Sequence, residues 1–183
     1  MNATELRNLQ APLKEKYKAE PESAIITLKA QGNIGEGISC NIETGRAIVK
    51  AGLHPATGGD GLLACSGDLL LQALVACAGV TLNAVATAIG IEIRNGKINA
   101  EGDLDFRGTL GVSKETPVGF KNIRLHFQFD SDATAEQIES LKKLTERYCV
   151  VYQTISKGVE IETSYNQVSS TAVNRVDGSA TDH

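Results

Sequence analysis

One stretch limits the fold of this chain more than any other: residues 69–91 contain no charged side chain. A run of this length could cross a bilayer, since a membrane-spanning helix needs about 20 apolar residues. Polar residues such as Thr81 interrupt the run, however, and many of the others are alanine or glycine, which let backbones approach closely. We therefore expect no membrane span but a helix buried between sheets, capped by Ser66 or Asp68 and ended by Gly90.

Segments with the pattern of β-strands lie on both sides of this helix. Gly and Asn punctuate the first fifty residues into a predicted β-meander over residues 24–30, 35–42 and 46–52. After the helix, apolar and polar residues alternate over residues 91–107, with a tight-turn signal at Asn95-Gly96, and again over residues 120–130. This alternation indicates an antiparallel sheet with one face in water.

The C-terminal part favours two helices and a last strand. Thr134 and Gln137 form a capping box, the helix breaks around Cys149, a short helix runs to Lys157, and residues 159–165 are a predicted strand. The domain prediction is a helical arm over residues 1–20, a folded domain over 21–165 and a disordered tail over 166–183. Strands and helices are not regularly interleaved, so the predicted fold class is α+β.

Composition excludes several functions. The net charge of −4, without any cluster of Lys and Arg, argues against nucleic-acid binding. Metal-ligand spacings, phosphate-binding glycine loops and serine-hydrolase elbows do not occur in the sequence, so we predict neither a metal nor a cofactor. The first residues carry no apolar leader, so we expect a cytoplasmic protein with reduced thiols.

The four cysteines are the remaining groups with chemistry. Cys77 lies mid-helix among alanines, where burial would raise its thiol pKa and leave it inert, and this is the simpler interpretation. Cys149 lies at a helix break, where the amides that begin the next helix would stabilise a thiolate. Cys40 and Cys65 are predicted to be incidental thiols.

Two segments resemble the OsmC/Ohr family of osmotically induced and organic-hydroperoxide-resistance proteins. They are DLLLQALVACAGVTL, residues 68–82, and ERYC, residues 146–149, which carry Cys77 and Cys149. The likeness extends over about residues 24–165. It implies an OsmC-like α+β fold in which antiparallel sheets pack around long central helices of an intertwined homodimer, with active sites at the interface.

The resemblance also implies a reaction. Cys77 would be the peroxidatic thiol, Cys149 the resolving thiol, and a hydroperoxide and an external dithiol the two substrates. Arg46 is the predicted activating residue, because the family takes an arginine from its N-terminal β region and Arg46 is the only arginine between Leu28 and Leu69. The sequence departs from the family at Gly67, which stands where hydroperoxide-resistance members carry a glutamate.

This departure keeps a second hypothesis open. Without the glutamate, the chain could be a non-catalytic OsmC-like module that binds a small apolar ligand at the dimer interface, with His54 and the glycine-rich loop after it as the rim. The stretch from His54 to Gly61 is predicted to be a loop with special backbone angles in either case.

Overall fold

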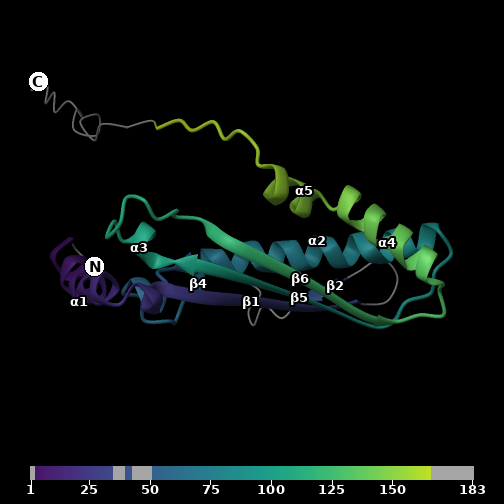
Figure 1. Cartoon of the computed structure of the whole chain (residues 1–183), viewed down its shortest axis with the longest axis horizontal. Coiled ribbons are helices and arrows are strands. Elements are labelled where there is room, and N and C mark those ends of the chain that lie inside the picture. Colours follow the sequence, from purple (N-terminus) through teal and green to yellow (C-terminus); the bar gives the residue numbers. More distant parts are fainter. Residues whose placement is uncertain (1–2, 35–39, 43–50, 166–183) are drawn as a thin grey trace, which may run out of the picture.

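A four-stranded antiparallel sheet forms one layer of the computed structural model, which describes residues 3–34, 40–42 and 51–165 (Figure 1). The strand order is β2-β1-β5-β6, with the bounds β1 Ile25–Ile34, β2 Cys40–Ile42, β5 Arg94–Asp105 and β6 Phe120–Asp130. The long helix α2, Ser66–Ala88, crosses one face of the sheet. The predicted α+β class is confirmed, because helices cover one face of an antiparallel sheet.

The alternating sequence of β5 and β6 separates an apolar face from a polar one. Ile98 and Ala100 are fully buried under α2. On the other face Arg124 bridges Asp103 and Glu101 of the neighbouring strand, with an Nη2–Oε2 distance of 3.3 Å to Glu101. The predicted sheet with one polar face is therefore present.

Helix α2 is apolar enough, with a mean hydropathy of 1.9, and long enough to cross a membrane by these two criteria. In this structure its apolar side chains pack against other elements of the chain. Leu71, Leu74 and Val75 are buried against the sheet, and Leu82 packs with Leu141 of α4 further along the helix. The absence of charge thus fits a helix that is in contact with other elements on several sides.

Two further helices pack on α2, namely α4, Ala135–Tyr148, and α5, Val150–Lys157. The predicted capping box is confirmed: the Gln137 amide donates to Thr134 Oγ1, and the Gln137 side chain accepts from the Thr134 amide. The predicted break at Cys149 and the stop at Gly158, whose φ is +69°, are also present.

A separate small core lies at the other end of the sheet. It joins α1, Ala3–Ala19, to the short helices η1, Pro21–Ala24, η2, Pro55–Thr57, and α3, Phe106–Thr109. The Tyr17 hydroxyl donates to Ala56 O over 2.7 Å. The His54 ring stacks on Phe106 with centroids 4.9 Å apart. Next to this core, β3, Ala51–Gly52, pairs in parallel with β4, Ala64–Cys65.

Two local predictions about backbone geometry are wrong. Asn95-Gly96 makes no tight turn: β5 is one strand, and Asn95, with φ +51°, sits where the pairing with β6 shifts register. Asn favours this left-handed conformation in a bulge as well as in a turn. The residue that caps α2 is Cys65, and its side chain makes no capping hydrogen bond.

The predicted strand over residues 159–165 is wrong as well. These residues are extended without strand pairing and lead away from the body of the molecule (Figure 1). Their apolar side chains are exposed, with 78% of Ile161 and 92% of Tyr165 accessible. The pattern is that of a strand, but within the described residues no strand edge lies beside it to accept its hydrogen bonds.

Candidate active site at the junction of α2 and α5

The two cysteines that the resemblance singled out lie together where α2 meets the α4–α5 corner. Cys77 is half-buried on α2, Cys149 is 1% exposed, and both are free thiols that influence each other's pKa. They are brought together from distant parts of the sequence because α2 packs on both α4 and α5. The structure therefore places one predicted pair of site residues in direct contact.

Cys149 forms the corner itself. It ends α4 through a hydrogen bond from its amide to Thr145 O, of 3.0 Å, and it begins α5 by accepting the Tyr152 amide at Sγ over 3.5 Å. The Gln153 side chain donates to Glu146 O over 2.7 Å and ties the two helices together. The corner is thus fixed by hydrogen bonds on both sides of Cys149.

Four donor groups lower the pKa of Cys77. They are the amides of Val151 and Val150 at the start of α5, the Cys149 thiol and the Thr81 hydroxyl. Burial alone would raise the pKa of Cys77, but these hydrogen bonds outweigh it, and the pKa lies below its ordinary value. The expectation that burial leaves Cys77 with a raised pKa is therefore wrong.

The pKa of Cys149 is shifted in the opposite direction. Burial, together with its hydrogen bond to Cys77 and the charge on that sulfur, raises the pKa of Cys149 to about 11, although the Tyr152 and Val151 amides lower it. The expectation of a stabilised thiolate at Cys149 is therefore wrong. The amides at the start of α5 instead lower the pKa of Cys77 on the facing helix.

The other predicted residues do not join this site in the described part of the chain. Arg46 lies outside the described residues, and for Cys40 only the backbone, in β2, is described. Cys65 is a partly buried thiol in the contact between α2 and the sheet. Gly67 is in the first turn of α2, ten residues before Cys77, a distance of about 15 Å along a helix.

His54 and the glycine-rich loop serve a structural purpose. The Ala56 amide donates to His54 Nδ1 over 3.0 Å, and Gly58, with φ +94°, ends the short η2 helix. Asp68 faces this loop: burial raises its pKa, and the charge of His54 lowers it. Within the described residues no group of three or more His, Cys, Asp or Glu could hold a metal ion.

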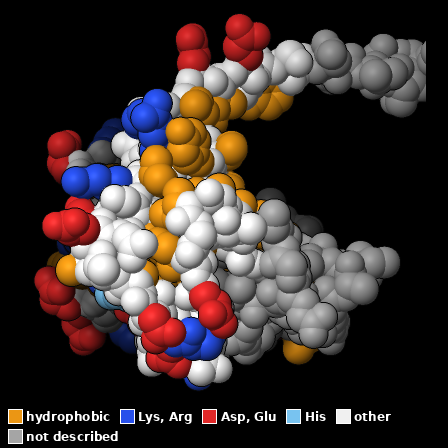
Figure 2. All heavy atoms as spheres, turned by 90° about the vertical axis from the view of Figure 1, so that its right-hand side faces the viewer, with side chains coloured by type: hydrophobic (Ala, Val, Ile, Leu, Met, Phe, Trp, Pro, Cys, Tyr) orange, Lys and Arg blue, Asp and Glu red, His pale blue; other side chains and the backbone are white. Residues whose placement is uncertain are grey.

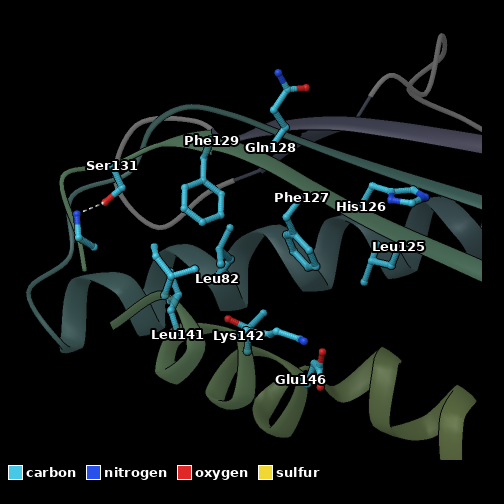
Figure 3. Close-up of a pocket in the computed structure, with 13 residues that line it drawn as sticks. Leu82, Leu125, His126, Phe127, Gln128, Phe129, Ser131, Leu141, Lys142 and Glu146 are labelled. Carbon is cyan, nitrogen blue, oxygen red and sulfur yellow. Dashed lines mark hydrogen bonds between the residues drawn. The ribbon is translucent and has the colours of Figure 1, made fainter. Parts of the chain in front are cut away.

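Two cavities flank β6. The first, of about 700 Å³, lies between β6 and α4, and Figure 3 shows Phe127 and Phe129 pointing into it while Gln128 points away. Lys142 and Glu146 lie on the α4 side, together with Thr145, whose hydroxyl is buried without a hydrogen-bond partner among the described residues. The second cavity, of about 860 Å³, lies between β6 and α5, and His54 lines neither of the two.

Residues 59–164, more than half of the chain, match the family described as OsmC-like protein. The chain belongs to this family. The matching region contains Cys77, Cys149 and Thr81, so the junction lies inside the part that this OsmC-like chain shares with its relatives. No curated protein sequence matches the chain.

Solved structures agree with the OsmC-like fold. An OsmC-like protein from Mycoplasma pneumoniae is 20% identical, with a TM-score of 0.51 over 74% of this chain and 86% of its own. An OsmC-like hydroperoxide resistance protein from Jannaschia sp. CCS1 is 13% identical, with a TM-score of 0.52 over 81% of this chain and 96% of its own. At these identities the likeness concerns the fold.

Sequence reasoning missed two parts of the site. It did not assign any role to Thr81, although a residue four positions after Cys77 lies on the same face of a helix. It also expected the amides at the start of α5 to act on Cys149 only, whereas those of Val150 and Val151 lower the pKa of Cys77, and that of Val151 lowers the pKa of Cys149 too. The spacing of Cys77 and Thr81 was a usable signal, whereas the direction of the amides depends on how α5 packs on α2.

Proposed function

We propose that this OsmC-like protein is a thiol-dependent peroxidase that reduces organic hydroperoxides, and hydrogen peroxide as a second substrate. Cys77 is the peroxidatic thiol and Cys149 the resolving thiol. The observation that supports this most is the pair of neighbouring free thiols in which Cys77 has the lowered pKa and Cys149 the raised one. Since the thiolate is the nucleophile, this asymmetry gives each sulfur its role.

The proposed reaction needs only these two sulfurs and an external dithiol. The Cys77 thiolate attacks the terminal oxygen of the hydroperoxide, the O–O bond breaks, and the departing alkoxide takes a proton from water and leaves as an alcohol. Cys77 is now a sulfenic acid. The Cys149 sulfur attacks it, a disulfide forms, and water is released. The dithiol reduces this disulfide and is itself oxidised to a disulfide.

The electrostatics of the pair favour this order of steps. In the resting protein the charge on Cys77 contributes to the raised pKa of Cys149, which keeps Cys149 protonated. Oxidation of Cys77 to the uncharged sulfenic acid removes that charge. Cys149 therefore ionises more easily after the peroxide has reacted than before it. Arg46 belongs to the proposal as the residue whose guanidinium would further favour the Cys77 thiolate.

The test is peroxide consumption by the purified protein. Cumene hydroperoxide and hydrogen peroxide are supplied with dihydrolipoamide, and the remaining peroxide is measured. We expect Cys77→Ser to reduce consumption to the background without protein, and Cys149→Ser to allow one turnover and then accumulate sulfinic acid at Cys77. Cys65→Ser is the matched control and should keep full activity. The proposal fails if the wild-type protein leaves both peroxides unchanged.

The peroxidase proposal includes a homodimer and a cytoplasmic location, where reductants keep the two thiols available. Exposed apolar side chains support the dimer: Val159 and Ile161 are largely exposed, and Figure 2 shows a band of hydrophobic side chains between the extended segment and the body. Light scattering should give twice the chain mass. Ile161→Asp should weaken the dimer, and Glu162→Gln, its neighbour along the chain, should not.

A second function is favoured by the apolar cavities beside β6. A protein that only binds a small apolar ligand would hold it in cavities of this size and would not need reactive thiols. Native mass spectrometry of the protein as purified separates the two proposals. A carried ligand with thiols that do not react with peroxide supports the binding module, whereas a Cys77–Cys149 disulfide after mild peroxide treatment supports the peroxidase.

A further inference from the structure

The cavity between β6 and α4 has a largely apolar interior. Phe127 and Phe129 point into it from β6, and Leu82 and Leu141 line it from the two helices (Figure 3). These four side chains belong to one hydrophobic cluster. The volume of about 700 Å³ is in the range of small-molecule sites, which enclose about 300–1,000 Å³. The two phenylalanine rings offer the kind of surface on which another aromatic ring packs well.

One polar group in this cavity is cut off from water. Thr145 lines the cavity from α4 and is 3% exposed, and its hydroxyl has no hydrogen-bond partner in the part of the chain that the structure describes. Such a hydroxyl destabilises a fold, because it has lost its hydrogen bonds to water and has gained none in return. A bound molecule with one hydrogen-bonding atom at this point would restore the missing bond.

The charged side chains beside the cavity oppose each other. Lys142 is exposed and Glu146 is half-buried, and Figure 3 shows both on the α4 side. They are four residues apart and so lie on one face of the helix. A carboxylate in the cavity would be attracted by Lys142 and repelled by Glu146, and an amine would meet the reverse. Because the two charges cancel, the cavity favours a neutral ligand.

We propose that the cavity between β6 and α4 is a binding site for a small, neutral aromatic molecule with one hydroxyl group. Its ring packs against Phe127 and Phe129, and its hydroxyl forms a hydrogen bond with that of Thr145. This inference rests on the apolar-ligand binding given above as the second function, and it adds the cavity, the anchoring residue and the class of ligand. Among the residues that line this cavity there is neither Cys77 nor Cys149, so the site is separate from the thiol pair.

The probe for this site is β-naphthol, followed by its own fluorescence. The chain contains no tryptophan, so the protein itself adds little emission. We expect saturable binding of one molecule per chain. The anion β-naphthoate has the same rings and should compete at least about tenfold more weakly than unlabelled β-naphthol, because a carboxylate loses more by leaving water. Equal or stronger competition by β-naphthoate would show that Lys142 selects an anion and would overturn the assignment of a neutral ligand.

The decisive comparison is between Thr145→Val and the wild-type protein. Valine has nearly the shape of threonine without its hydroxyl. We expect Thr145→Val to weaken the binding of β-naphthol about 3–10-fold, in line with the loss of one neutral hydrogen bond, and to leave that of naphthalene, which has no hydroxyl, within about twofold. Thr145→Ser keeps the hydroxyl and should bind β-naphthol within about threefold of wild type. Equal affinities of wild type and Thr145→Val for β-naphthol would overturn the proposal.

The matched control is Thr154→Val, because Thr154 lines the second cavity, between β6 and α5. It should leave the binding of both probes unchanged. Ala133→Phe places a large side chain in the first cavity and should abolish the binding of both. The proposal fails if β-naphthol binding falls in Thr154→Val and not in Thr145→Val, if folded Ala133→Phe still binds the probes, or if the wild-type protein shows no saturable binding.

Three outcomes separate this site from the two functions proposed above. A protein that consumes peroxide but binds no β-naphthol would contradict the site alone. Binding that depends on Thr145 in a protein that consumes no peroxide would contradict the peroxidase and retain the site, and Cys77→Ser should bind β-naphthol as wild type does. A ligand carried through purification by both Thr145→Val and Ala133→Phe would support apolar-ligand binding elsewhere in the protein and overturn this site.

Discussion

Two stretches of the same helix do different work. The earlier stretch of α2 presses Leu71, Leu74 and Val75 against the sheet, where all three are 3% exposed or less. The next turns carry Cys77 and Thr81 to the α4–α5 corner, where the contacts that matter are hydrogen bonds to sulfur. The comparison teaches that stability and thiol reactivity depend on neighbouring turns of one helix that carries no charge after Asp68.

The largest effect should come from the sheet-facing stretch. Leu71→Ala removes a fully buried side chain and should lower the free energy of unfolding by about 2–5 kcal/mol, measured by urea denaturation. Leu70→Ala, at a side chain that is 39% exposed, is the control and should cost much less. The pH profile of Cys77 alkylation by iodoacetamide in the folded Leu71→Ala protein should stay as in wild type. A shifted profile would show that the packing of the sheet-facing stretch also controls the reactivity of Cys77.

The thiol pair offers the next test. The alkylation rate of Cys77 should rise with pH as its thiolate forms, and it should level off at a lower pH than for a free cysteine, because its pKa is lowered. With a pKa of about 11, Cys149 remains almost wholly protonated at pH 8, so Cys77 should react about 100-fold faster. Peptide mapping measures both rates in one sample. Similar rates would contradict the proposed roles.

The smallest effect should come from Thr145, which lies on α4 one turn before Cys149. Its hydroxyl is buried without a partner among the described residues, so Thr145→Val should stabilise the fold by about 1 kcal/mol. Thermal unfolding with Thr145→Ser as the control measures this. A loss of stability in Thr145→Val would mean that the hydroxyl is paired in solution, and the corner would then depend on more than the bonds described above.

Features coded by neighbouring residues could be predicted from the sequence. The capping box of α4 and the alternation of β6 are local patterns, and the structure follows both. The predicted contact between Cys77 and Cys149 came from the family resemblance, because no local pattern relates two residues so far apart. Their electrostatics could not be predicted, since the direction of the α5 amides is set by packing on α2.

Other features depend on what lies beside a segment. Residues 159–165 have the alternation of a strand, but a strand also needs an edge to pair with, and the sequence does not say whether one is available. Asn95 marks a position of left-handed backbone, which a bulge and a tight turn use equally. In both cases the local conformation was predicted correctly. The element that such a segment pairs with is distant in the sequence, and it decides which structure forms.

The long apolar helix α2 also has a consequence for how this protein is made. Helix α2 leaves the ribosome about 40 residues ahead of the end of β6, which at about 5–20 residues per second leaves it partly uncovered for several seconds. Its hydropathy is sufficient for a membrane span, so we expect chaperones and the insertion machinery to bind the nascent chain at this stage. We expect chains arrested after α2 to crosslink to such factors and chains arrested after α5 to escape them.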